Sequence, residues 1–359
     1  MRKHLGKRIY KLHQWTGLFA GIVIFILGLS GAVLAFHDEL ESRAHRDLLK
    51  VSNSSPVDVD RALGSINTRY RNWEVRLQAY SPDPSRTLVF SLRRPTERLT
   101  VFVHPGTGVI LESVDTHKTF VNWVLTLHYS LHARLAGQVI IFLAGVCFLV
   151  SILTGLYIYR RAVWDVVLFR TRVKKKTGRS VASSLHRYVG VWTLLLNLIM
   201  VLSGALISYE ITTNALKAGG KPKKPAVTPV LGFSVNEKLA EIRRIYPEFH
   251  PASMRFPTAA GLPLRISGPV DGTGPFWSPN YNSVLIDSGT GEIQAFKNQG
   301  NADTATRVAS VSRAVHFLEF GSLPVKVLFS LSALSAPVLS VTGFLLWYWR
   351  SRGGARKGR

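Results

Sequence analysis

Thiols and charged side chains are scarce in this sequence, and each shortage excludes a class of protein. Among 359 residues there is a single cysteine, Cys147. Disulfide frameworks, iron–sulfur clusters and cysteine-ligated zinc sites all need several thiols and are therefore excluded. The signature motifs of nucleotide-binding loops and of serine or zinc hydrolases are absent as well. Hydrophobic residues make up 47% of the chain, which excludes an intrinsically disordered protein.

Charged residues amount to only 18% of the sequence, and four long stretches contain none. Each stretch is at least as long as the roughly 20 residues that cross the hydrocarbon core of a bilayer. Buried helices of a soluble protein rarely remain uncharged over such a length, so we predict four transmembrane helices. The stretches are residues 15–36, 135–159, 188–209 and 327–349.

Basic residues cluster beside these spans. Lys and Arg outnumber Asp and Glu by 45 to 21, a net charge of +24, and most of this excess lies in residues 1–14, 160–187 and 350–359. The positive-inside rule places these three segments in the cytoplasm, facing membrane lipids. The charge is thereby explained without a nucleic-acid partner. Two large loops then lie outside, in the periplasm if the protein resides in a bacterial inner membrane.

The fold predicted from these observations is a four-helix membrane protein with a two-fold internal repeat and two small α+β periplasmic domains. Each outer loop has one helical pattern followed by alternating strands and a Gly-Thr-Gly hairpin turn. The expected order is N-terminus and first span 1–37, periplasmic domain 38–118, periplasmic helix and second span 119–160, basic loop 161–186, third span 187–209, periplasmic domain 210–303, interfacial helix 304–321, fourth span 322–349 and basic tail 350–359.

The two halves of the chain match each other at constant offsets. LHQWTG at residues 12–17 matches LHRYVG at 185–190, and LSGA at 29–32 recurs at the same offset at 202–205. At a second constant offset, His128 matches His316 and the Thr-Gly of 154–155 matches that of 342–343. Offsets that stay constant along a helix indicate a duplicated unit of helix, outer domain and helix.

Four histidines are kept by this repeat. His13 and His186 lie at the cytoplasmic starts of the odd-numbered spans, and His128 and His316 precede the even-numbered spans on the outer side. Two histidine pairs at opposite membrane faces are the pattern expected of two b-type haems with two axial imidazoles each. The alternative is that these histidines are solvated side chains at helix ends.

Other residues of the outer side are weaker candidates. His37 and His132 are alternate ligands for the outer haem, although the repeat keeps neither. The aromatic side chains of Trp123, Phe276, Trp277 and Tyr281 are candidates for lining a substrate surface above that haem. The alternative for these aromatics is anchoring at the membrane interface or packing within the domains.

Several segments resemble the PepSY-associated transmembrane helix family over nearly the whole chain. They are LHQWTGLFAG, LHYSLHARLAG, LHRYVGVW and HFLEFGSLPVKVL. Members of this family include inner-membrane, haem-binding reductases that release iron from ferric siderophores, and the four-span layout is most similar to those acting on hydroxamates of the ferrioxamine type. The resemblance implies haem ligation by His13 with His186 and by His128 with His316.

The function expected is therefore transmembrane reduction of a periplasmic ferric siderophore to release Fe(II). The electron donor would be a cytoplasmic partner or a quinol. A siderophore transporter is the main rival, but transporter sites contain broken helices or charges at mid-membrane, and Pro337 is the only such feature in the four spans. A non-enzymatic binding or regulatory membrane protein is the third reading.

Overall fold

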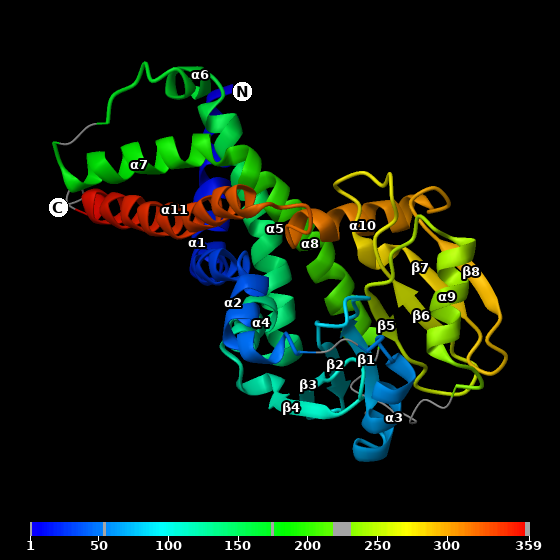
Figure 1. Ribbon diagram of the computed structural model, residues 1–359. Helices are drawn as coiled ribbons and strands as arrows, with labels where there is room; N and C mark the ends of the chain where they lie inside the picture. The colour runs from blue at the N-terminus through cyan, green and yellow to red at the C-terminus, as the bar shows by residue number, and fades with distance from the viewer. Residues whose placement is uncertain (1, 53–54, 174–175, 218–230, 356–359) are drawn as a thin grey trace. The chain divides into compact units, whose positions relative to one another are not determined.

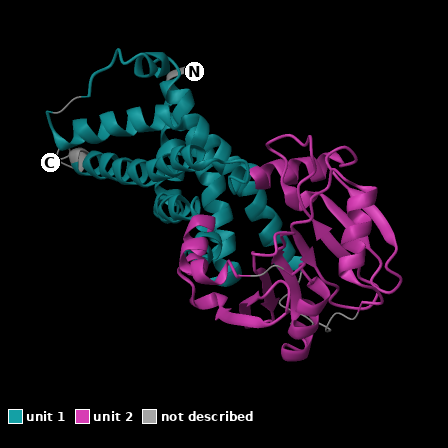
Figure 2. Cartoon of the chain, in the orientation of Figure 1, with its two compact units in different colours: residues 1–37, 124–220, 315–359 teal, residues 38–123, 221–314 magenta. Residues whose placement is uncertain are grey.

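The computed structural model describes residues 2–52, 55–173, 176–217 and 231–355. Parts of the expected basic loop and basic tail, residues 174–175 and 356–359, lie outside this described portion. The chain divides into two compact units (Figures 1 and 2). We call residues 1–37, 124–220 and 315–359 the helical unit, and residues 38–123 and 221–314 the sheet unit.

Long apolar helices make up the helical unit. Four of them are long and apolar enough to cross a membrane, which confirms the prediction of four spans on length and composition. These four are α1 (Arg2–Leu34), α5 (Arg134–Tyr159), α8 (Leu194–Lys217) and α11 (Leu323–Ala355), and shorter helices lie beside them: α4 (Phe120–Ser130), α6 (Val163–Val167) and α7 (Gly178–Trp192). Packing joins α1 to α5 and α11, and α8 to α5.

The third span differs from its expected bounds. The apolar stretch 188–209 is divided at Thr193, where α7 ends and α8 begins. The Thr193 hydroxyl donates to the carbonyl of Val189 and accepts from Asn197, so its side chain supplies hydrogen bonds at the break. The helix expected over 304–321 is shorter in the structure: α10 (Thr304–His316) ends at His316, and six residues separate it from α11.

Small and polar residues bring the spans into close contact. A Cβ atom on Gly28 of α1 would lie 2.6 Å from Cδ of Pro337 in α11, so only glycine allows these helices to approach this closely. Between α8 and α11, the buried amide of Asn197 donates to Ser335 Oγ over 2.9 Å. A hydrogen bond between two buried side chains fixes how these two helices face each other.

One antiparallel sheet of eight strands forms the framework of the sheet unit. The strands run in the order β4-β3-β2-β1-β5-β6-β7-β8. Their bounds are β1 (Glu74–Ala79), β2 (Leu88–Arg93), β3 (Arg98–Val103), β4 (Ile110–Asp115), β5 (Ser253–Arg255), β6 (Leu264–Ser267), β7 (Ser283–Ile286) and β8 (Ile293–Lys297). The helices of this unit include α2 (His37–Ala44), α3 (Val59–Arg69), α9 (Val235–Ile245) and most of α10, with short 3-10 turns at Arg46–Leu48, Thr116–Lys118 and Pro279–Tyr281.

The two outer segments share a single sheet and a single core, whereas the sequence led us to expect two separate small domains. Pairing of β1 with β5 joins them, and α3 and α9 contribute to one hydrophobic core. Their helix starts also cap each other. The Asp60 carboxylate accepts from the backbone N–H of Val235, and Asn236 Oδ1 accepts from the N–H of Val59. Each half thus supplies hydrogen bonds that the other half needs.

Candidate functional site

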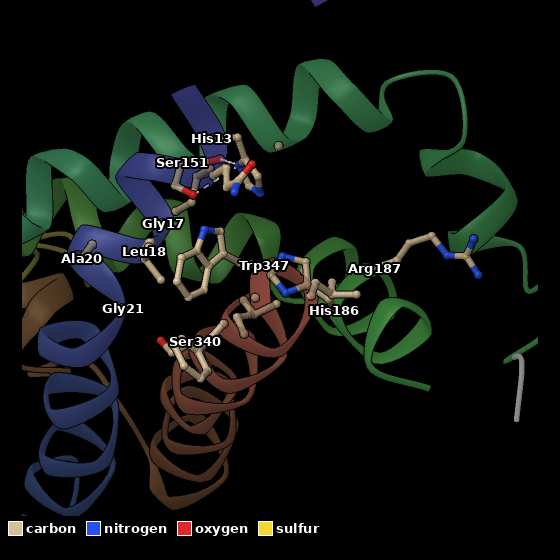
Figure 3. Close-up of a pocket in the computed structure, with 18 of the residues that line it drawn as sticks. His13, Gly17, Leu18, Ala20, Gly21, Ser151, His186, Arg187, Ser340 and Trp347 are labelled. Atoms are coloured by element: carbon tan, nitrogen blue, oxygen red, sulfur yellow. Dashed lines mark hydrogen bonds between the residues drawn. The ribbon is translucent and has the colours of Figure 1, made fainter. Parts of the chain in front are cut away.

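His13 and His186 lie together at one end of the helical unit (Figure 3). His13 comes from α1 and His186 from α7, and their ring centroids are 6.2 Å apart with the ring planes at 82°. The structure thus brings together two residues that are far apart in sequence and that the repeat predicted to act as a pair. We call them the α1–α7 pair.

His128 and His316 form a second pair, the α4–α10 pair. Their ring centroids are 6.3 Å apart, nearly the same separation as in the first pair. The alternate ligands lie elsewhere: His132 is exposed in the turn between α4 and α5, and His37 Nδ1 lies 3.2 Å from the carbonyl oxygen of Leu34. The pairing expected from the repeat is therefore the one that the structure places together.

Every one of the four histidines contacts a Ser-Gly or Thr-Gly dipeptide on a different helix. The contact is a hydrogen bond between the ring Nδ1 and the hydroxyl of the dipeptide, and each of the four long helices carries one dipeptide. The pairs are His13 with Thr154 (3.3 Å), His186 with Thr342 (2.9 Å), His128 with Ser30 (2.9 Å) and His316 with Ser203 (3.2 Å). His13 Nδ1 also lies 2.9 Å from the carbonyl oxygen of Ser151, the bond drawn in Figure 3.

These hydrogen bonds determine the tautomer of the rings. Each of the four hydroxyls already donates its one hydrogen to the carbonyl four residues earlier in its own helix, over 2.6–2.9 Å. The hydroxyl oxygen must then accept, so the ring Nδ1 carries the hydrogen and donates it. In a neutral imidazole this leaves the lone pair on Nε2, which is the nitrogen available to bind a metal.

The glycine of each dipeptide provides the space that the ring occupies. A Cβ atom on Gly204 would lie 2.7 Å from His316 Cε1, and one on Gly155 would lie 3.1 Å from His13 Cε1. The corresponding distances are 3.2 Å from Gly31 to His128 and 3.4 Å from Gly343 to His186. The dipeptide therefore supports the histidine in two ways. Its hydroxyl orients the ring, and its glycine, which has no side chain, leaves space for the ring.

A cavity of about 750 Å³ opens beside the α1–α7 pair. Its volume is in the range of small-molecule and cofactor pockets. Glycines line it at one-turn spacing from the histidines: Gly17 and Gly21 on α1, and Gly190 on α7. Arg179, Arg187 and Arg350 also contribute to the lining. Arg187 points away from the two rings in Figure 3, and its Nε is buried without a hydrogen-bond partner among the described residues.

The separation of the paired rings fits one metal ion between them. Two imidazoles that bind a first-row metal from opposite sides, at about 2 Å per bond, have ring centres roughly 6 Å apart. Both pairs meet this condition at 6.2 and 6.3 Å. At the α1–α7 pair, which also has the cavity and its glycines, the residues present fit haem iron bound by two histidines. The α4–α10 pair matches the first pair in ring separation and in the Nε2 tautomer.

The four aromatic candidates differ in their exposure. Trp277 is 6% exposed, and its Nε1 donates to Asn282 over 2.7 Å, so its role is packing within the sheet unit. Its ring lies 6.4 Å from that of Tyr281. Phe276 and Trp123 are half exposed, the first in the loop before Trp277 and the second on α4.

The Ser and Thr residues of the dipeptides belong to the candidate site as well, although their sequence alone did not assign them to it. The repeat did mark them, because LSGA and Thr-Gly recur at the same offsets as the histidines. The offsets did not show which histidine each dipeptide contacts. A histidine on one helix contacts a dipeptide on another, so the assignment depends on how the helices pack.

Comparison with known families identifies the chain. The family described as the PepSY-associated TM region matches residues 10–350, which includes the whole sheet unit, α5 and α8, and most of α1 and α11. No curated protein matches the chain. The match extends over far more than half of the sequence and includes all four histidines with their dipeptides. This chain therefore belongs to the PepSY-associated transmembrane family.

Proposed function

We propose that this protein is an inner-membrane dihaem reductase that passes electrons across the membrane to a ferric siderophore in the periplasm. The observation that carries the proposal is the fourfold arrangement of a histidine on a Ser/Thr-Gly dipeptide. It brings the rings of each pair to centroid separations of 6.2 and 6.3 Å and leaves Nε2 of each ring free to bind a metal. His13 and His186 would hold one b-type haem, and His128 and His316 the other. Haem supplies one-electron transfer at a potential set by its axial ligands and burial.

The lining of the cavity supports haem over a bare metal ion. A bare ion needs further ligands, whereas a macrocycle needs a flat apolar space bordered by glycines, such as Gly17 and Gly190. Haem also carries two carboxylates, which guanidinium groups bind well. Arg179, Arg187 and Arg350 all line the cavity and would supply such groups.

The positions of the two pairs along α1 support electron transfer across the bilayer. His13 of the first pair and Gly31, which contacts His128 of the second, lie on the same helix. At 1.5 Å per residue their Cα atoms are about 27 Å apart, close to the roughly 30 Å of the hydrocarbon core. A haem near each end of this distance would divide the electron transfer, which is too long for a single step, into shorter steps.

Reduction is the chemistry that frees iron from a siderophore. Ferric iron is held by hard oxygen ligands, and the ferrous ion binds them more weakly, so one electron per iron suffices for release. Hydroxamates of the ferrioxamine type are the substrates that the family resemblance favours. The electron donor would be a quinol or a cytoplasmic partner that meets the basic face near α6 and α7.

A stopped-flow experiment tests this proposal. Protein reduced with a stoichiometric amount of dithionite is mixed anaerobically with ferrioxamine in the presence of a ferrous chelator. We expect the haem spectrum to return to its oxidised form as one Fe(II) appears per electron, with apo-siderophore left in solution. Haem that stays reduced, with transport of intact ferrioxamine into proteoliposomes, would instead establish the transporter.

The Thr342→Val variant tests the role of the dipeptide hydroxyls. Valine has nearly the same shape but cannot accept from His186 Nδ1, so the imidazole donates less electron density to the iron. We expect the midpoint potential of one haem to rise by tens of millivolts while the other haem is unchanged. Thr342→Ser, which keeps the hydroxyl, should restore the original value in a redox titration. Equal shifts in both haems would contradict a local effect at His186.

A further inference from the structure

Five arginines lie on one face of the eight-stranded sheet. Alternate residues of a strand face opposite sides, and Val75 and Leu77 of β1 point into the core beneath α3 and α9. The other face therefore carries Arg76 of β1 and the residues in register with it. The arginines of this face are Arg76 (β1), Arg93 (β2), Arg98 (β3), Arg255 (β5) and Arg265 (β6).

These arginines are direct cross-strand neighbours. Arg76 pairs in register with Arg255, and Arg255 pairs with Arg265, so three adjacent strands present guanidinium groups in one row. On the next row Arg93 pairs with Arg98. Side chains that face each other across antiparallel strands have Cβ atoms about 5 Å apart, and like charges placed there destabilise the sheet.

Carboxylates on this face are too few to neutralise the row. Glu74 lies opposite Arg93 and forms an ion pair with Arg76. The other carboxylate in this register is Glu112 on the edge strand β4, opposite Phe102. One central carboxylate thus stands among five guanidinium groups, so the face retains a strong positive charge.

Arg93, the last residue of β2, has unused hydrogen-bonding capacity on this face. Its Nε is buried and has no hydrogen-bond partner among the described residues. Burial lowers the pKa of Arg93 to about 10, and the nearby charges of Arg76 and Arg98 contribute to the same effect. Arg255 is affected in the same direction: burial, then the charge of Arg76, lowers its pKa. A buried, unsatisfied donor surrounded by like charges is stabilised when an anion is bound.

A row of hydroxyl groups lies beside the arginine row. Ser253 of β5 pairs in register with Ser267 of β6, which in turn pairs with Ser283 of β7. Ser253 and Ser267 are two residues from Arg255 and Arg265 in their own strands. Ser283 is two residues from Leu285, which pairs with Arg265, so all three serines lie on the same face as the arginines. Ser267 and Ser283 are buried, with 8% and 1% of their surface exposed, so the guanidinium groups beside this row are the donors that an anion can reach. Guanidinium forks bind carboxylate and phosphate oxygens.

We propose that this sheet face is a binding site for a multivalent oxyanion, a ligand with several carboxylate or phosphate groups, bound chiefly by Arg76, Arg93 and Arg255. The ligand is either a soluble polyanion or the headgroup of an anionic lipid, because both present the same oxygens to guanidinium groups. The site does not depend on haem and is not part of the electron-transfer proposal.

The test uses the full-length protein in nanodiscs of phosphatidylcholine, which add no net charge. Citrate and pyrophosphate serve as soluble probes, measured by titration calorimetry and by the rise in the unfolding temperature of the sheet unit. The lipid arm replaces phosphatidylcholine with phosphatidylglycerol in the disc. The variants are Arg255→Gln and Arg93→Gln. Arg255 is partly covered but retains an exposed surface, and Arg244→Gln, at an exposed position of α9, is the matched control.

We expect the wild type and Arg244→Gln to respond to the same probe, with at least tenfold weaker binding in Arg255→Gln. Response to citrate or pyrophosphate identifies a soluble ligand, and response only to phosphatidylglycerol identifies a lipid headgroup. Without any anion, Arg93→Gln should unfold at the same temperature as the wild type or higher, because removing one charge relieves repulsion. The proposal is overturned if neither arm separates Arg255→Gln from the wild type, or if Arg244→Gln loses as much binding.

Discussion

The His13→Ala variant is expected to purify with one haem per chain in place of two, and His128→Ala is expected to do the same. Each change removes one of two axial ligands from a different pair, while the other pair keeps its histidines and its Ser/Thr-Gly supports. The double variant should contain no haem. Pyridine haemochrome analysis against protein concentration measures the content, and the remaining haem in each single variant should stay low-spin.

The control for these variants is His132→Asn. His132 is exposed and has φ of 54°, a left-handed conformation that asparagine tolerates better than alanine. We expect this variant to keep both haems. Loss of a haem from His132→Asn, with full content in His128→Ala, would transfer the ligand role to His132 and contradict the pairing of His128 with His316.

The Gly204→Ala variant is expected to disable the site of the α4–α10 pair, whereas Gly343→Ala should be tolerated. The added Cβ would lie 2.7 Å from His316 Cε1 in the first case and 3.4 Å from His186 Cε1 in the second. The shorter distance requires the ring to move by several tenths of an ångström, although Ser203 holds its Nδ1. Displacement on this scale is enough to spoil a metal site.

The measurement compares two otherwise identical substitutions in one protein. Gly204→Ala should lower the affinity for one haem by about 10- to 100-fold or convert it to a high-spin form. Gly343→Ala should retain both haems in their low-spin spectra. Similar effects of the two variants would mean that the distance between glycine and ring does not control the site.

Much of the helical unit could be predicted because its signals are local in sequence. A bilayer requires a long uncharged stretch, and the four stretches correspond to four helices. The break at Thr193 could not be predicted in this way. The surrounding residues are uniformly apolar, without glycine or proline at the break, and the hydrogen bonds that Thr193 makes depend on the folded geometry.

The sheet unit was predicted in its parts but not in its assembly. The alternation of apolar residues predicted a helix followed by strands in each outer segment, which is the observed order of elements. Strand β5 was missed because it has only three residues, Ser253–Arg255, too few for a periodic pattern. The pairing of β1 with β5 joins the edge strands of the two halves. The sequence of an edge strand does not specify which other edge it will pair with.

The histidine pairs were predictable because duplication repeated them at fixed offsets. The supporting dipeptides were visible as repeats, but their partners were not, since His13 contacts Thr154 and His128 contacts Ser30 across different helices. The five arginines of the sheet face were also invisible as a group. They lie on five strands, and only the register brings them together.

The haem content and spectrum of the wild-type protein test the central claim most directly. Protein purified in detergent from cells supplied with haem is oxidised, then reduced with dithionite, and its haem is counted as the pyridine haemochrome. The account predicts two b-type haems per chain, both low-spin with two histidine ligands. A colourless protein, folded but without haem under these conditions, would contradict the account.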